Sequence, residues 1–200
     1  MRPVGYLICY PGDLQGERGS HYDYVTACNG LFVEAVGDLL TARVPIAPVR
    51  LRGLAELEPS VILRHGKIPS YLFDLALNVM MTDAAKERYV AINWAPIQKH
   101  YSVYIPQQDR QPAHIAYDLK DNLFPIVMDL HSHGRMKPFF SGEDNRDEQG
   151  FRIYGVVGNL DRDPRLLVRI GVYGYYFPLV AADVFEGIVS IRGETNELET

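Results

Sequence analysis

The spacing of the apolar residues changes near residue 70, and this change constrains the fold more than any other feature of the sequence. From there the apolar residues fall on one side of a helix, at Leu72, Leu75, Ala76, Val79 and Met80. This spacing predicts an amphipathic helix over about 70–85, with Ser70 as its N-cap after Pro69. Strand-like segments broken by turn residues flank the helix on both sides. The chain is therefore predicted to have an α/β fold.

The pattern predicts three regions along the chain. Residues 1–65 are expected to form a β-rich N-terminal lobe, because strand-like runs at Val4–Tyr10 and Leu31–Leu40 alternate with turn residues. Residues 66–185 are expected to form the α/β core, and residues 186–200 a polar C-terminal tail.

Strand-like runs within the core lead to a polar motif. Arg88–Trp94 and Gln98–Ile105 predict a hairpin, and the apolar run Ile126–Leu130 continues directly into His131. Further strands are predicted at Ala113–Leu119, Ile153–Val157, Leu166–Val172 and Tyr175–Val180. The histidine is thus expected at the end of a buried strand.

Composition excludes several classes of protein. The formal net charge is -5, and Lys and Arg are scattered, which argues against nucleic-acid binding and against attraction to an anionic membrane. Two cysteines, Cys9 and Cys28, are too few for a disulfide scaffold. The first residues lack the pattern of a signal peptide, and no apolar run is long enough to span a membrane. These features predict a cytoplasmic protein with a protein or small-molecule partner.

The chemistry is concentrated in His131-Ser132-His133 and the residues that follow it. Histidines two apart on an extended strand point to the same side, so both rings can reach one metal ion. Ser141 can cap a short helix whose first turn brings Asp144 beside them. Two nitrogens and one carboxylate oxygen form a three-ligand zinc site that leaves a fourth position open, as in catalytic sites.

A simpler interpretation is also open, in which the histidines lie in a polar loop and Ser141 to Asp144 only begin a helix. The acidic residues Asp147 and Glu148 lie close to this segment in the sequence. We expect them on the exposed face of the short helix, or paired with Arg146 and Arg152.

The pattern H-x-H-x(7)-S-x-x-D resembles the signature of the JAMM metalloprotease family, also called JAB or MPN+, and it is complete in this sequence. The resemblance implies a cytidine-deaminase-like mixed β-sheet flanked by helices. It also implies zinc held by His131, His133 and Asp144, with Ser141 stabilising an oxyanion and an upstream Glu acting as general base.

Two glutamates compete for the role of general base. Glu87 follows the predicted helix, begins a predicted strand and is the last Glu before the histidines, but Val90 stands where many relatives have Gly. Glu34 matches E-x-x-G literally, yet no amphipathic helix precedes it. We favour Glu87. A further departure is Gly134, where many relatives have Pro after the second His.

Most of the chain also resembles the PRTRC system protein A family, through H-S-H-G, F-F-S-x-x-D and the following Asp147-Glu148. That resemblance implies a bacterial, plasmid-associated system with a ubiquitin-like protein and a ThiF-like activating enzyme as partners. The implied activity is that of a zinc peptidase or isopeptidase acting after the C-terminus of the ubiquitin-like protein. The alternatives are a catalytically idle scaffold of the same family and a zinc hydrolase of a small amide or nucleotide.

Overall fold

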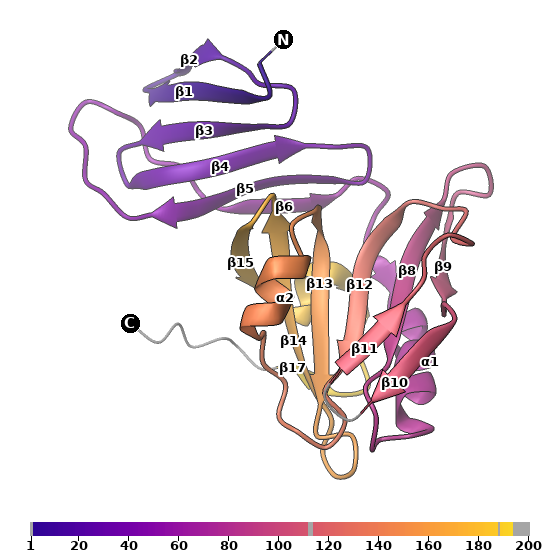
Figure 1. The fold of residues 1–200 in the computed structure, drawn as a ribbon. Helices are drawn as coiled ribbons and strands as arrows, with labels where there is room; N and C mark the ends of the chain where they lie inside the picture. The colour runs from indigo at the N-terminus through magenta and orange to yellow at the C-terminus, as the bar shows by residue number, and fades with distance from the viewer. Residues whose placement is uncertain (1, 112–113, 188, 194–200) are drawn as a thin grey trace. The chain divides into compact units, whose positions relative to one another are not determined.

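The computed structural model describes residues 2–111, 114–187 and 189–193, and these divide into two compact units (Figure 1). Unit 1 comprises residues 1–64, 149–151 and 170–177, and unit 2 comprises residues 65–148, 152–169 and 178–200, in each case with the undescribed positions left out. The protein is a mixed α/β fold, rich in strands and with few helices, as its sequence predicts.

Unit 1 is built on a six-stranded sheet in the order β2-β1-β3-β4-β5-β6. Its strands are β1 (Val4–Tyr10), β2 (Asp13–Glu17), β3 (Tyr22–Ala27), β4 (Gly30–Val36), β5 (Leu40–Ala47) and β6 (Ser60–Leu63). The predicted strand at Val4–Tyr10 is confirmed. The run Leu31–Leu40, predicted as one strand, belongs instead to two, because the chain turns back between Val36 and Leu40.

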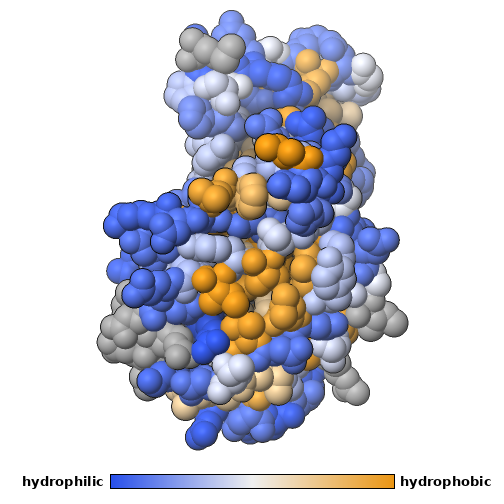
Figure 2. Space-filling model, turned by 90° about the vertical axis from the view of Figure 1, so that its right-hand side faces the viewer, coloured by the Kyte–Doolittle hydropathy of each residue, from blue (hydrophilic) through white to orange (hydrophobic). Residues whose placement is uncertain are grey.

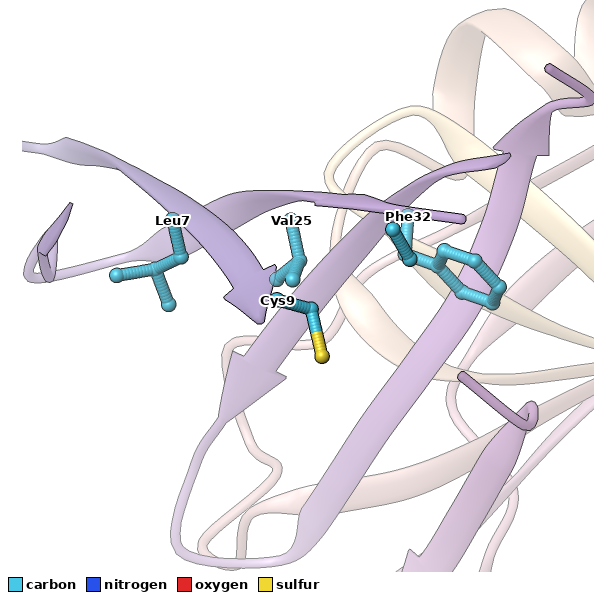
Figure 3. Packing of buried hydrophobic residues seen from close by; sticks show 5 residues of the cluster. Leu7, Cys9, Val25 and Phe32 are labelled. Carbon is cyan, nitrogen blue, oxygen red and sulfur yellow. The ribbon is translucent and has the colours of Figure 1, made fainter. Parts of the chain in front are cut away.

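One face of this sheet carries a cluster of buried apolar residues. Register pairs Leu7 with Val25 and Val25 with Phe32, so their side chains share a face, and Cys9 joins them (Figure 3). Ala27 completes the cluster, and all five side chains are buried. Burial of the larger of these side chains contributes roughly 1.5–3 kcal/mol each to the stability of the sheet.

Glu34 on β4 is buried in unit 1, and both of its carboxylate oxygens accept hydrogen bonds from arginines. Arg18 donates from Nη1 to Oε1 at 2.8 Å, and Arg43 donates from Nε to Oε2 at 2.7 Å. Burial acts to raise the pKa of the Glu34 carboxyl, but the hydrogen bonds and charges of the two arginines outweigh it and leave the pKa below its ordinary value. Glu34 is thus a paired structural carboxylate.

We expect Glu34→Gln to lower the free energy of unfolding by about 1–3 kcal/mol at neutral pH, because it removes a carboxylate bonded to two charged groups. A lowered folded pKa stabilises the protein above the unfolded pKa of about 4.3 and loses that effect as the pH falls through the folded pKa. The difference in melting temperature between wild type and variant should therefore shrink below pH 4.3. A difference that is constant from pH 7 to pH 3 would contradict this assignment.

The second large sheet has seven strands, with the order β15-β14-β13-β12-β8-β9 and with β17 paired to β14. The elements that follow β6 begin with β7 (Ile68–Pro69), α1 (Ser70–Met81), β8 (Tyr89–Ala95), β9 (His100–Tyr104), β10 (Gln108–Gln111) and β11 (His114–Tyr117). They continue with β12 (Ile126–Ser132), α2 (Gly142–Asp147), β13 (Phe151–Gly158), β14 (Arg165–Val172), β15 (Tyr175–Leu179), α3 (Ala181–Val184), β16 (Phe185–Glu186) and β17 (Arg192–Gly193). β12 pairs parallel with β13 and antiparallel with β8, so the sheet is mixed.

The predicted helix is present as α1, but two details differ. It ends at Met81 rather than near residue 85, because Thr82 turns the chain and donates its hydroxyl to the carbonyl of Val79 at 2.8 Å. Ser70 is the first helical residue and not the N-cap, since Pro69 occupies that position. The predicted hairpin is confirmed by the antiparallel pairing of β8 with β9.

The two faces of the second sheet differ in character. Leu130 on β12 pairs with Val90 on β8, and both are fully buried on the apolar face. His131 pairs with Tyr89 on the opposite face, where Tyr89 stacks on Tyr117 of β11 with ring centroids 3.9 Å apart. In Figure 1, α2 and the β10–β11 hairpin are drawn in front of this sheet. The histidine is therefore on the face that α2 also approaches.

The space-filling view of Figure 2 shows apolar side chains gathered in a patch on the face that it draws. Large apolar side chains that are exposed in unit 2 include Tyr71, Leu75, Met81, Ile97 and Ile105. Within the described ranges, none of the helices has the length and apolar character needed to cross a lipid bilayer.

The predicted C-terminal tail lies partly outside the described residues. Glu186 belongs to β16, which pairs parallel with β7, and β17 pairs parallel with β14. Residues 188 and 194–200 are not among those that the structure describes.

Candidate metal centre

Strand β12 ends at Ser132 and positions His131 and His133 with their rings close together. His131 is the last residue but one of the strand, and His133 follows it, held by a hydrogen bond from its amide to the carbonyl of Val157 on β13 at 2.8 Å. The Nε2 atoms of the two rings are 3.2 Å apart. The expected convergence of both imidazoles on one point is therefore present.

Helix α2 supplies a carboxylate to the same point. Ser141 is its N-cap, as predicted, and accepts a hydrogen bond at Oγ from the amide of Asp144 at 3.1 Å. Asp144 returns the bond, since its Oδ2 accepts from the amide of Ser141 at 2.5 Å. This capping box leaves the second carboxylate oxygen, Oδ1, 3.3 Å from Nε2 of His131. The helix cap and the cluster are thus two aspects of one arrangement.

The spacing of these three groups fits a tetrahedral zinc ion. Ligand atoms about 2.0–2.1 Å from zinc stand about 3.3 Å apart in a tetrahedron. The observed edges are 3.2 Å between the histidines and 3.3 Å from His131 to Asp144, and one ligand atom from each of the three residues lies within 4.8 Å of the others. With three protein ligands, such a site retains an open position.

The charge states of the histidines also suit metal binding. Burial lowers the pKa of His131 to about 4, although the neighbouring Asp144 carboxylate acts in the opposite direction. Burial likewise lowers the pKa of His133 below its ordinary value. Both rings are therefore neutral at pH 7, and neutral imidazole is the form that binds a metal ion.

Glu87 lies two residues before β8, in the segment that joins α1 to that strand, and its side chain is buried. Burial, followed by the charges of Asp144 and Glu143, raises the pKa of the Glu87 carboxyl to about 7. A carboxyl group with this pKa can both accept and donate a proton at neutral pH. The charge of Asp144, a member of the metal cluster, thus acts on the Glu87 carboxyl. Glu34, the competing candidate, is instead paired with two arginines in unit 1.

Two residues that the sequence motif does not explain tie the Glu87 segment to the histidines. Ser132, fully buried between them, accepts at Oγ from the amide of Arg88 at 3.0 Å, and its own amide donates to the Arg88 carbonyl at 2.9 Å. Gly134 has a φ of +56°, and a Cβ there would lie 2.7 Å from the carbonyl oxygen of Ala84. Proline, with φ near −65°, cannot adopt this turn, which explains the departure from the family pattern.

The prediction for Glu148 as an exposed or Arg146-paired residue is wrong. Only 11% of its side chain is exposed, and its Oε2 accepts from Nη2 of Arg169 at 2.5 Å and from Nε at 3.1 Å. Its Oε1 lies 3.9 Å from Nδ1 of His131. Arg152 pairs with Asp129 instead, at 2.9 Å. Short-range helix spacing could not indicate this, because Arg169 lies 21 positions away on β14.

The two phenylalanines before Ser141 pack against side chains of the site, His133 and Arg169. The Phe139 ring meets the His133 ring edge-on with centroids 4.5 Å apart, although 47% of Phe139 is exposed. The Phe140 ring lies under the guanidinium of Arg169, whose Cζ is 3.8 Å from the ring centroid. The Phe139 ring therefore contacts a candidate ligand, and the Phe140 ring contacts Arg169.

Comparison with known families agrees with this geometry. Residues 76–170 match the model of the family described as prokaryotic homologs of the JAB domain. This range includes Glu87, the three candidate ligands and Ser141. No curated protein gives a significant match to the sequence. Residues 76–170 of the chain are thus similar to the JAB family.

Proposed function

We propose that this protein is a zinc-dependent peptidase or isopeptidase that cleaves after the C-terminus of a ubiquitin-like protein. The JAB family includes zinc isopeptidases and also inactive members, so the active site must decide between them. The observation that carries the proposal is the convergence of His131, His133 and Asp144, with spacing suited to zinc, beside the buried Glu87. An inactive scaffold has no need to keep this set together.

Each residue has a defined part in the proposed reaction. His131, His133 and Asp144 would hold zinc, which when bound supplies Lewis acidity and activates water at neutral pH. Glu87 accepts the proton of the attacking water and passes it to the leaving amine, a task suited to its raised pKa. Ser141 uses Oγ as an acceptor in the helix cap, so its hydroxyl proton is available for a developing oxyanion.

The proposal extends to the fold and the partners. We propose a cytidine-deaminase-like arrangement for the JAB domain, with a ubiquitin-like protein or its conjugates as substrate and a ThiF-like activating enzyme as a partner in the same system. The net charge of -5 favours a protein partner over a nucleic acid.

The proposal is tested with a ubiquitin-like protein fused through its C-terminus to a reporter, incubated with the zinc-loaded protein, with and without chelator. Chelator-sensitive cleavage at the junction, restored by added zinc, is the expected result. Binding of the fusion without cleavage would indicate an idle scaffold. Hydrolysis of a small amide or nucleotide, with the fusion left intact, would indicate the other class of zinc hydrolase.

The role of Ser141 is separable from its role as a cap. Replacing a Ser N-cap by Gly costs only a few tenths of a kcal/mol of stability, whereas loss of an oxyanion donor lowers kcat by about 10²–10³-fold. We expect Ser141→Gly to show this loss in the fusion assay with little change in melting temperature, and Ser141→Thr to retain activity because it keeps the hydroxyl. Full activity of the Gly variant would exclude Ser141 from catalysis.

A further inference from the structure

Helix α2 carries the candidate ligand Asp144, but its own residues do not anchor it to the sheet. It has six residues, none of them buried, and a helix of this length is not stable by itself in water. The capping box fixes Asp144 relative to the start of the helix and does not fix the helix relative to β12. Another group must anchor α2 to the sheet.

Arg169 on β14 makes that connection. Its side chain is buried, with 6% exposed, and its guanidinium contacts three residues placed around Asp144. Nη1 donates to Oδ1 of Asn145 at 2.6 Å, and Nε and Nη2 donate to Oε2 of Glu148. The guanidinium also lies on the Phe140 ring. Phe140 stands four residues before Asp144, and Asn145 and Glu148 stand one and four residues after it. One rigid group therefore holds both ends of the segment that carries the ligand.

The contact of Arg169 with Glu148 also affects His131, the second candidate ligand. Arg169 fixes Oε2 of Glu148, and the other oxygen, Oε1, then lies 3.9 Å from Nδ1 of His131. At this distance Glu148 acts on Nδ1 by its charge rather than by a hydrogen bond, and a negative charge there favours the tautomer that carries its proton on Nδ1 and its lone pair on Nε2. Arg169 thus acts on Asp144 through the helix and on His131 through Glu148.

We propose that Arg169 is a positioning residue of the metal centre, which holds Asp144 and His131 in ligand geometry by anchoring α2 and Glu148 to β14. This inference rests on the proposed zinc site. Lysine replaces arginine only in part here, because a single ammonium group lacks the planar fork that bonds both Glu148 and Asn145.

The test measures zinc affinity by competition with a chromogenic chelator, and the visible absorption of the Co²⁺-loaded protein. Arg169→Met should lower zinc affinity about 10–100-fold, the usual effect of removing an outer-shell partner of a metal ligand, and should alter the cobalt spectrum. Arg169→Lys and Glu148→Gln, which disturb folding less, should show smaller losses in the same direction. Arg152→Met is the matched control, since it removes a part-buried ion pair to Asp129 on the same sheet without touching α2.

The control should lose thermal stability in the zinc-free state, as Arg169→Met does, but keep wild-type zinc affinity. Wild-type affinity in both Arg169→Lys and Glu148→Gln would overturn the positioning role, even if Arg169→Met does not fold. Equal losses of affinity in Arg152→Met and Arg169→Met would also overturn it, because the effect would then be general destabilisation. A wild-type protein without zinc affinity would instead remove the proposed function itself.

Discussion

Glu87→Gln is expected to retain about one zinc ion per chain and to lose cleavage activity by roughly 10²–10⁴-fold, the range that a general base contributes. Glutamine has the same shape as glutamate but cannot accept the proton of the attacking water. Zinc content is measured on the purified variant and kcat in the fusion assay. The matched control is Glu34→Gln, which removes the competing carboxylate from unit 1 and should leave kcat unchanged.

The same variant should differ from wild type in stability. The Glu87 carboxyl has a folded pKa of about 7, raised by burial, then by Asp144 and Glu143. An unfolded Glu has a pKa of about 4.3, so the folded state binds more protons between these values and loses stability as the pH rises through them. With chelator present at pH 8, Glu87→Gln should therefore melt at a higher temperature than wild type. A lower melting temperature together with full activity would exclude Glu87 as the base.

The metal cluster could be predicted from sequence because each of its constraints is local. Histidines two apart on a strand must point to one side, and a Ser three residues before an Asp forms a capping box. The structure brings His131, His133 and Asp144 together in this way. The cap and the cluster, which the sequence leaves as alternative interpretations of Ser141 to Asp144, coexist because the Asp carboxylate has two oxygens.

The parts that could not be predicted depend on contacts between distant segments. Arg169 lies on β14, 21 positions after Glu148, and only the strand order brings the two together. The role of Gly134 depends on Ala84, in the turns after α1. The sequence predicts the end of α1 too late for a different reason, because the spacing of apolar residues gives no sign of the turn at Thr82.

Unit 1 is harder to predict because one of its strand pairs, β1 with β3, is not consecutive in sequence. β1 lies between β2 and β3 and pairs parallel with β3, so one short strand has two partners. The segment Asp13–Glu17 is mostly polar, and Tyr22–Ala27 has a charged residue, Asp23, on its buried side, so both give a weak signal for a strand. The sequence indicates a β-rich region there without indicating its register.

Asp144→Asn is expected to remove most of the bound zinc while leaving α2 in place. The asparagine oxygen can still accept the hydrogen bond from the Ser141 amide, so the cap is kept, but the anionic ligand beside His131 is lost. His131→Ala should lose zinc as well, whereas His100→Ala, at an exposed residue of β9, should bind about one zinc ion like wild type. Metal analysis after dialysis gives the stoichiometry, and circular dichroism shows whether each variant folds. If Asp144→Asn and His131→Ala fold and bind zinc as tightly as wild type, the three residues do not share an ion, and the hydrolase assignment fails with them.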